Sequence, residues 1–146
     1  MKTYQPENFN IRELVSKRFY NIWGHQSMWF LDQMVLVDVD FIRNDLDRSI
    51  TINDWQWDGN YNESGLRTKG DEYYSPTSAH AFGKAFDLKV EGMSSFEVQD
   101  YIKKISSKDK LKGINRLEVG TDGWTHVDGF NAKPNDEKSG LYLFRP

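Results

Sequence analysis

Two histidine-bearing segments, far apart in the sequence, place the strongest constraint on how this chain can fold. The first is SAHAFGKAFD, residues 78–87, and the second is WTHVD, residues 124–128. Two imidazoles and one carboxylate can hold a zinc ion and leave a coordination position open, which distinguishes a catalytic zinc site from a structural one. The sequence therefore predicts a fold that brings His80, Asp87 and His126 together, and it favours metal-assisted hydrolysis.

Length and composition are those of one folded domain. The 146 residues are 38% hydrophobic and 14% aromatic, so the chain can bury a core without disulfides. Because it contains no cysteine, any metal ligand must be a His, Asp or Glu. We expect residues 1–146 to form a single compact α+β domain.

Charge and hydropathy argue against two classes of partner. The net charge of -3 comes without the clustered Lys and Arg that nucleic-acid binding requires. No apolar stretch approaches the length of a membrane span, and no apolar signal region follows residues 1–4. We expect a monomer that is synthesised in the cytoplasm without a signal peptide, binds no nucleic acid and does not insert into a membrane.

Capping signals and apolar periodicity predict three helices. Asn10 with Glu13, and Ser94 with Glu97, have the spacing of a capping box, in which two side chains satisfy free backbone N–H groups. Apolar side chains recur every three or four residues after both boxes and in a segment between them. The expected helices span residues about 10–22, 32–47 and 94–106.

Further segments are expected to form a small, mostly antiparallel sheet that the helices flank. Residues 50–52 are β-branched, and residues 86–90 alternate strictly between apolar and polar side chains. This alternation places Asp87 on the face opposite to the apolar side chains of its strand. The long polar segment 58–79 is expected to be a functional loop.

Residues 116–120 and 124–128 predict a β-hairpin with a three-residue connection, whose glycine suits a left-handed turn position. In that register Glu118 lies opposite His126, and both side chains share a face with Asp128. A slip of one residue would move Glu118 to the other face. Glu118 is therefore the candidate general base, and Asp128 either competes for that role or orients a ligand imidazole.

Residues 78–87 and 124–128 together resemble the M15 metallopeptidases, the zinc D-alanyl-D-alanine carboxypeptidases and their phage endolysin relatives. Gly65-Leu-Arg67 occupies the place of the Gly-Tyr-Arg segment of that family, and residues 8–14 resemble the opening of phage and prophage members. The resemblance covers most of the chain. It implies the M15 or hedgehog-like zinc peptidase fold.

The same resemblance implies a role for each residue of the site. It implies that His80, Asp87 and His126 bind Zn²⁺. It also implies that Glu118 is the general base and that Arg67 binds the substrate carboxylate or polarises its carbonyl. A guanidinium suits that role because it offers a planar, bidentate fork. The alternative is a loop arginine paired with a nearby carboxylate.

Ser78 and Trp124 are further candidates for substrate binding. Ser78 either hydrogen-bonds the site or caps its loop. Trp124 either lines a groove for a glycan or peptide stem, together with Trp55, Trp57 and Tyr61, or packs at the edge of the core.

The function that the resemblance implies is zinc-dependent hydrolysis of a peptide bond in the stem peptide of bacterial peptidoglycan. The enzyme would be a D-Ala-releasing carboxypeptidase or an endopeptidase, of phage or prophage type, that acts on the cell wall after release or as part of a virion. One alternative is a non-catalytic zinc-binding module of the same fold, such as a virion component. A mononuclear iron enzyme is disfavoured, because His80 precedes the His126–Asp128 pair instead of following it.

Overall fold

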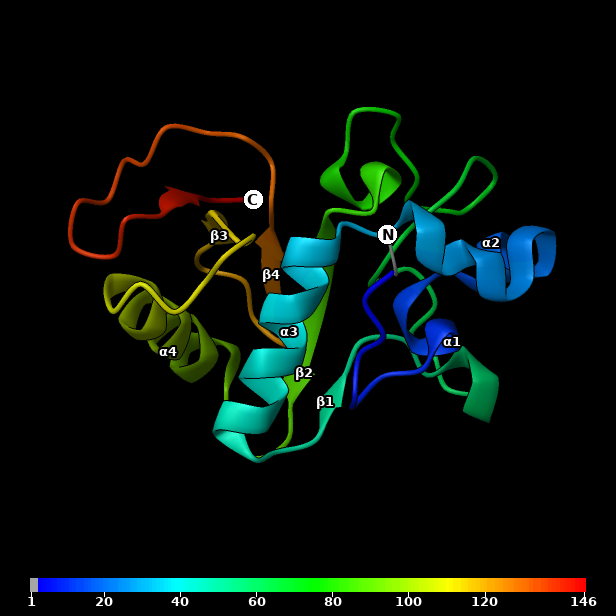
Figure 1. Cartoon of the computed structure of the whole chain (residues 1–146), viewed down its shortest axis with the longest axis horizontal. Coiled ribbons are helices and arrows are strands. Elements are labelled where there is room, and N and C mark those ends of the chain that lie inside the picture. The colour runs from blue at the N-terminus through cyan, green and yellow to red at the C-terminus, as the bar shows by residue number, and fades with distance from the viewer. Residues whose placement is uncertain (1–2) are drawn as a thin grey trace.

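A five-stranded sheet in the order β1-β2-β4-β3-β5 forms the centre of the fold in the computed structural model, which describes residues 3–146 (Figure 1). The first three pairings along this order are antiparallel, whereas β3 and β5 are parallel. The strands are β1 (Ile50–Thr51), β2 (Ala85–Val90), β3 (Arg116–Glu118), β4 (Thr125–Asp128) and β5 (Tyr142–Phe144). The sheet is therefore mixed, with antiparallel pairs in the majority.

The described residues also form four α-helices and three short 3₁₀-helices, so the α+β class is confirmed. In Figure 1, α3 lies in front of β2, with α4 to one side and α1 and α2 to the other. Within residues 3–146, no helix combines the length and the apolar character that crossing a bilayer requires. The helices are α1 (Ile11–Leu14), α2 (Lys17–Trp23), α3 (Gln33–Leu46) and α4 (Ser95–Ser107), with 3₁₀-helices at Gly24–Phe30, Trp55–Trp57 and Ala79–Phe82.

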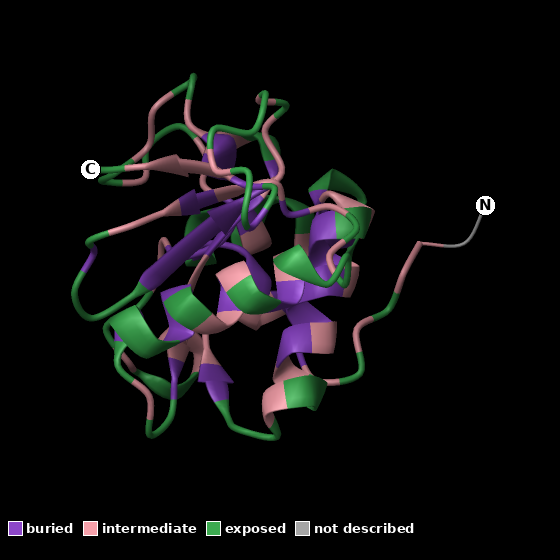
Figure 2. Ribbon diagram, turned by 90° about the vertical axis from the view of Figure 1, so that its left-hand side faces the viewer, coloured by how far each residue is buried: buried purple, intermediate pink, exposed green. Residues whose placement is uncertain are grey.

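The core lies on the face of the sheet that carries Phe86 and Leu88. Both side chains are fully buried, as are Leu117 of β3 and Val127 of β4. The apolar side of α3 packs into the same cluster, and Figure 2 shows buried residues concentrated in the central strands and the helices against them. Asp87 is only half-buried, on the other side of β2, as its place in the alternation predicted.

Two predicted helices are confirmed, and the second of them has the capping box that was predicted for it. Asp32 accepts hydrogen bonds from the first turn of α3, and Ser94 forms the expected capping box with Glu97 at the start of α4. The helix over 10–22, however, was predicted wrongly as continuous. It is divided into α1 and α2 by an extended Val15.

The break in this helix has a tertiary cause. Val15 pairs with Leu66 in an isolated parallel bridge, with Leu66 N donating to Leu14 O at 3.0 Å and Ser16 N donating to Leu66 O at 2.9 Å. Helical geometry at Val15 would leave these bonds unmade. The interruption therefore fixes residues 65–67 beside the sheet, where they contribute to the site.

The hairpin of β3 and β4 has the predicted register. Arg116 pairs with Asp128 and Leu117 with Val127, and the same register continued by one residue sets Glu118 opposite His126. The three-residue connection, by contrast, was wrong. The strands end at Glu118 and restart at Thr125, so the connection spans 119–124.

Helix α4 explains the longer connection. The carbonyl of Thr121 accepts hydrogen bonds from Ser95 Oγ at 2.8 Å and from Gln99 Nε2 at 3.1 Å, which buries Thr121 against the helix. Gly123 does take the left-handed conformation expected of it, with φ of 92°. Side chains of α4 thus position the loop that carries Trp124.

Candidate metal centre

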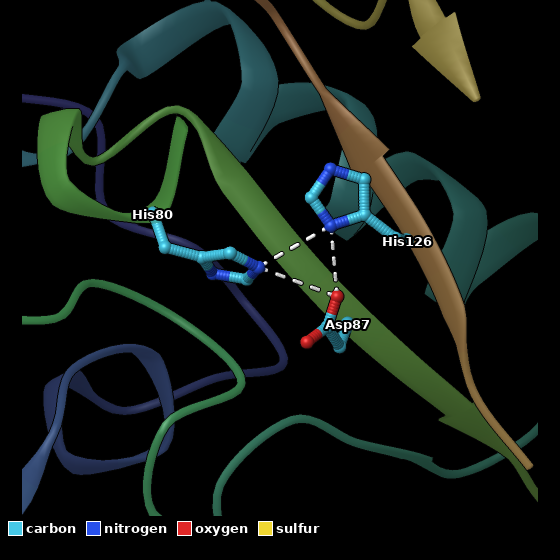
Figure 3. Close-up of side chains that lie close together, drawn as sticks. All are labelled: His80, Asp87 and His126. Atoms are coloured by element: carbon cyan, nitrogen blue, oxygen red, sulfur yellow. Dashed lines mark hydrogen bonds and ion pairs between the residues drawn. The ribbon is translucent and has the colours of Figure 1, made fainter. Parts of the chain in front are cut away.

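The three predicted ligands meet above the middle of the sheet, with their donor atoms turned toward one another (Figure 3). Asp87 Oδ1 lies 3.0 Å from His126 Nδ1 and 3.4 Å from His80 Nε2, and the two imidazole nitrogens are 3.3 Å apart. Both histidines are buried and Asp87 is half-buried. This group could hold a metal ion.

Adjacent strands and a tight turn position these side chains. Asp87 on β2 and His126 on β4 are direct partners in the antiparallel register, so their side chains share a face. His80 comes from the 3₁₀-helix Ala79–Phe82, which Gly83 ends with φ of 68°. A Cβ on Gly83 would lie 2.0 Å from the carbonyl oxygen of Phe30, so the turn requires glycine here.

His80 is oriented by the segment that interrupts the first helix. Its Nδ1 lies 2.8 Å from the carbonyl oxygen of Gly65, which can only accept, so Nδ1 carries the hydrogen and Nε2 presents its lone pair to the group. Gly65 lies very close to the backbone of Leu14, since a Cβ on Gly65 would be 2.1 Å from Leu14 O. The carbonyl therefore selects the ring nitrogen that is available for a metal.

His126 is oriented by Asp128. The Asp128 Oδ2 atom lies 2.7 Å from His126 Nε2, so this nitrogen carries a hydrogen and Nδ1 faces Asp87. Asp128 is fully buried and accepts two hydrogen bonds from Arg116, at 2.7 and 2.8 Å, and one from Phe130 N. Its position behind the ring is that of a residue that orients a ligand, and it does not face the metal group.

The electrostatics of the group suit a cation. Burial raises the pKa of Asp87, but its hydrogen bond with His126 and its interaction with the adjacent His80 ring outweigh burial and hold that pKa well below its usual value. Burial lowers the pKa of His126, but Asp128 and Asp87 raise it to about 9. Without metal, the protonated His126 ring is thus held between the carboxylates of Asp87 and Asp128. A divalent ion would replace the proton on Nδ1.

Arg67 lies beside the metal group with its guanidinium already engaged. Its Nε donates to Glu63 O at 2.6 Å, Nη1 to Tyr73 O at 3.2 Å, and Nη2 to Asp87 Oδ2 at 3.5 Å. Only 15% of the side chain is exposed. The structure therefore places Arg67 against the oxygen of Asp87 that does not face the imidazoles.

A cavity of about 1010 Å³ opens onto the three ligands. Glu118, the candidate base, and Trp124, a candidate for substrate binding, both lie in its wall. Ser78 also lines it, but its Oγ accepts from His80 N at 3.2 Å and caps the 3₁₀-helix, which is the second of its two predicted roles.

The fold separates the four aromatic residues that were proposed to line one groove. Tyr61 and Trp124 line the cavity. Trp55 instead donates from Nε1 to Val15 O at 3.0 Å, and Trp57 is an exposed residue that does not line the cavity. Only part of the predicted aromatic surface therefore faces the site.

Lys89 is a cavity residue that sequence reasoning did not select. Its Nζ donates to Ile52 O at 2.7 Å and to Ser64 Oγ at 2.8 Å, and it lies 4.0 Å from the ring centroid of Tyr61. Burial lowers the pKa of Lys89 to about 8, against the opposing effect of Asp87. The alternation along β2 already put Lys89 on the face of Asp87, so the signal was present.

The donor set fits zinc, for which two imidazoles and a carboxylate are common ligands, and also suits mononuclear iron. No model of a known protein family, no curated protein and no solved structure matches this chain. The functional argument therefore depends on the geometry of the site and on the motif resemblance.

Proposed function

We propose that the protein is a zinc-dependent peptidase that hydrolyses a peptide bond in the stem peptide of bacterial peptidoglycan. The observation that carries the proposal is the pre-orientation of both imidazoles. His80 and His126 each commit one ring nitrogen to an oxygen outside the group and turn the other toward Asp87. Such paired supports are typical of metal sites.

The number of ligands favours catalysis over a structural role. A structural zinc site is closed by four protein ligands, whereas a catalytic site has three and keeps one position for water or substrate. In the part of the chain that the structure describes, the group has three members, and a large cavity opens onto it. The substrate class is taken from the resemblance of residues 78–87 and 124–128 to the M15 metallopeptidases.

In this proposal, His80, Asp87 and His126 would hold a zinc ion, which when bound would supply Lewis-acid chemistry and a lowering of the pKa of water from ~15.7 to roughly 7. The carboxylate of Glu118, in the wall of the same cavity, accepts the proton that the water loses and returns it to the leaving amine. Asp128 keeps the hydrogen of His126 on Nε2, and Arg67 keeps Asp87 in place.

The test is digestion of purified peptidoglycan by the zinc-loaded protein, with mass spectrometry of the released peptides. We expect fragments with new termini from the wild type and from His25→Ala, which alters an exposed histidine outside the metal group. We expect none from His126→Ala. Zinc-loaded wild type that releases no fragment would contradict the peptidase proposal and leave the non-catalytic module, acting in a virion or elsewhere.

A further inference from the structure

We infer that Lys89 is a positioning residue of the metal centre, which holds residues 64–67 against β2 so that the carbonyl of Gly65 orients the ring of His80. The inference rests on the metal centre of the proposed function, but not on the substrate or on the reaction. It gives a role to a charged residue that is neither a ligand nor the candidate base. The contacts along one edge of β2 carry it.

The neighbour of β2 on this edge changes next to Lys89. Strand β1 is two residues long, and its last residue, Thr51, is the partner of Lys89 in the antiparallel register. Two residues before Lys89, the backbone N–H of Asp87 donates instead to Ser64 O at 2.8 Å. Residues 64–67 thus take over this edge of β2 where β1 ends, directly beside a metal ligand.

The ammonium of Lys89 binds both neighbours at this point. Its Nζ donates at 2.7 Å to Ile52 O, one residue beyond β1, and at 2.8 Å to Ser64 Oγ. Ile52 is fully buried and Ser64 is buried, so the loss of the ammonium would leave polar atoms without a donor away from water. Lys89 therefore links the end of β1 to residues 64–67.

The residue after Ser64 orients a metal ligand. Gly65 O lies 2.8 Å from His80 Nδ1, and Arg67 N donates to His80 O at 3.1 Å. Both the ring and the backbone of His80 are therefore bound to this short segment. A displacement of Ser64 would move the adjacent Gly65 carbonyl, and with it the support of the ligand ring.

Two side chains hold residues 64–67 against β2. Arg67 Nη2 donates to Asp87 Oδ2 over a long distance of 3.5 Å, whereas the bond from Lys89 to Ser64 Oγ measures 2.8 Å. The opposite side of the segment is fixed by Asn53, whose Oδ1 accepts from Ser64 N at 2.9 Å. The shorter side-chain link to β2 therefore comes from Lys89.

Hydrogen exchange at two ring nitrogens tests the inference in the metal-free protein. Ser64→Ala removes the oxygen that Lys89 binds and leaves the other bond of the ammonium intact. We expect NMR to show the His80 Nδ1 hydrogen exchanging with water about tenfold faster than in wild type, while the His126 Nε2 hydrogen keeps its rate. A general loss of stability would speed both. An equal effect at the two rings, or none at His80, would overturn the inference.

Zinc affinity tests the lysine itself, by competition with a chromophoric chelator. Lys89→Met keeps the apolar stem without the ammonium and should lower affinity by about tenfold or more, with a smaller loss for Ser64→Ala. The double variant should lose no more than Lys89→Met alone, because both changes break the same bond. Ser107→Ala, at the exposed end of α4, is the matched control and should keep wild-type affinity. Losses that multiply in the double variant would contradict the inference.

These measurements use no substrate, so they are independent of peptidase activity. Wild type that binds zinc and cuts no peptidoglycan would remove the proposed function and leave the role of Lys89 standing. Wild-type zinc affinity in Lys89→Met would overturn that role whether or not the protein is a peptidase. If Lys89→Met does not fold, the exchange rate at His80 in Ser64→Ala decides.

Discussion

The carboxylate of Asp128 accepts the hydrogen of His126 Nε2 at 2.7 Å and thereby fixes the ring so that Nδ1 faces Asp87. Arg116 holds this carboxylate through two short hydrogen bonds, and the guanidinium of Arg116 lies 4.5 Å from the ring centroid of Phe144. The orientation of one ligand thus depends on β3, β4 and β5 together. The parallel strand β5 belongs to this support although the sequence did not indicate it.

Asp128→Asn tests this support. The amide keeps the size of the carboxylate but loses the charge that stabilises His126 and pairs with Arg116. We expect zinc affinity to fall by about 10- to 100-fold with all three ligands present, as measured by competition with a chromophoric chelator. Asp122→Asn, at an exposed position outside the metal group, is the matched control and should keep wild-type affinity. Equal affinities of the two variants would contradict the role given to Asp128.

Glu118→Gln separates catalysis from metal binding. Glu118 is not a member of the ligand group, so the variant should bind zinc like the wild type. Loss of the carboxylate that moves the proton should lower kcat on peptidoglycan fragments by about 10²- to 10⁴-fold. An unchanged kcat would exclude Glu118 as the base.

Zinc-dependent stability should increase with pH. Burial lowers the pKa of His126, but the two carboxylates raise it to about 9 from its ordinary 6.5. A folded-state pKa above the unfolded one means that this stabilisation of the metal-free protein is complete below pH 6.5 and is lost as pH rises to about 9. Zinc binds only the neutral ring, so the stabilisation that zinc adds grows as His126 loses its proton with rising pH. We expect the zinc-induced rise in Tm to grow between these pH values in wild type; a rise independent of pH would contradict the assignment.

Gly83→Ala tests the turn that carries His80. The substitution combines a left-handed backbone with a Cβ only 2.0 Å from Phe30 O, so we expect a loss of roughly 1–3 kcal/mol in the free energy of unfolding. Gly140→Ala has a similar φ of 75° but open space around the Cβ, and it controls for the backbone effect alone. Chemical denaturation measures both. A loss no larger than that of Gly140→Ala would show that the close contact is tolerated.

The elements that the sequence predicted correctly are those fixed by neighbouring residues. The capping box of Ser94 and Glu97 places the start of α4, and alternation along β2 places Asp87 on the face of the site. The pairing that sets Glu118 opposite His126 followed from the hairpin pattern, although its connection did not. Local patterns therefore sufficed for the strands that carry Asp87 and His126 and for the strand faces on which these side chains lie.

What the sequence did not reveal depends on contacts between distant segments. The break at Val15 exists because Leu66 pairs there, and its one local sign, the N-cap residue Ser16 at the start of α2, did not enter the prediction. The same pairing brings Gly65 O to His80 and Arg67 to Asp87. Sequence reasoning named Arg67, but only the fold shows that its guanidinium already donates to Glu63, Tyr73 and Asp87.

The most direct test of the account is the zinc content of the purified wild-type protein and of four alanine variants. It is measured by mass spectrometry of the bound metal under anaerobic conditions. We predict one zinc per chain in wild type and in His25→Ala, and none in His80→Ala, Asp87→Ala or His126→Ala. Equal zinc in all five proteins, or iron in place of zinc in the wild type, would contradict the metal centre proposed for His80, Asp87 and His126.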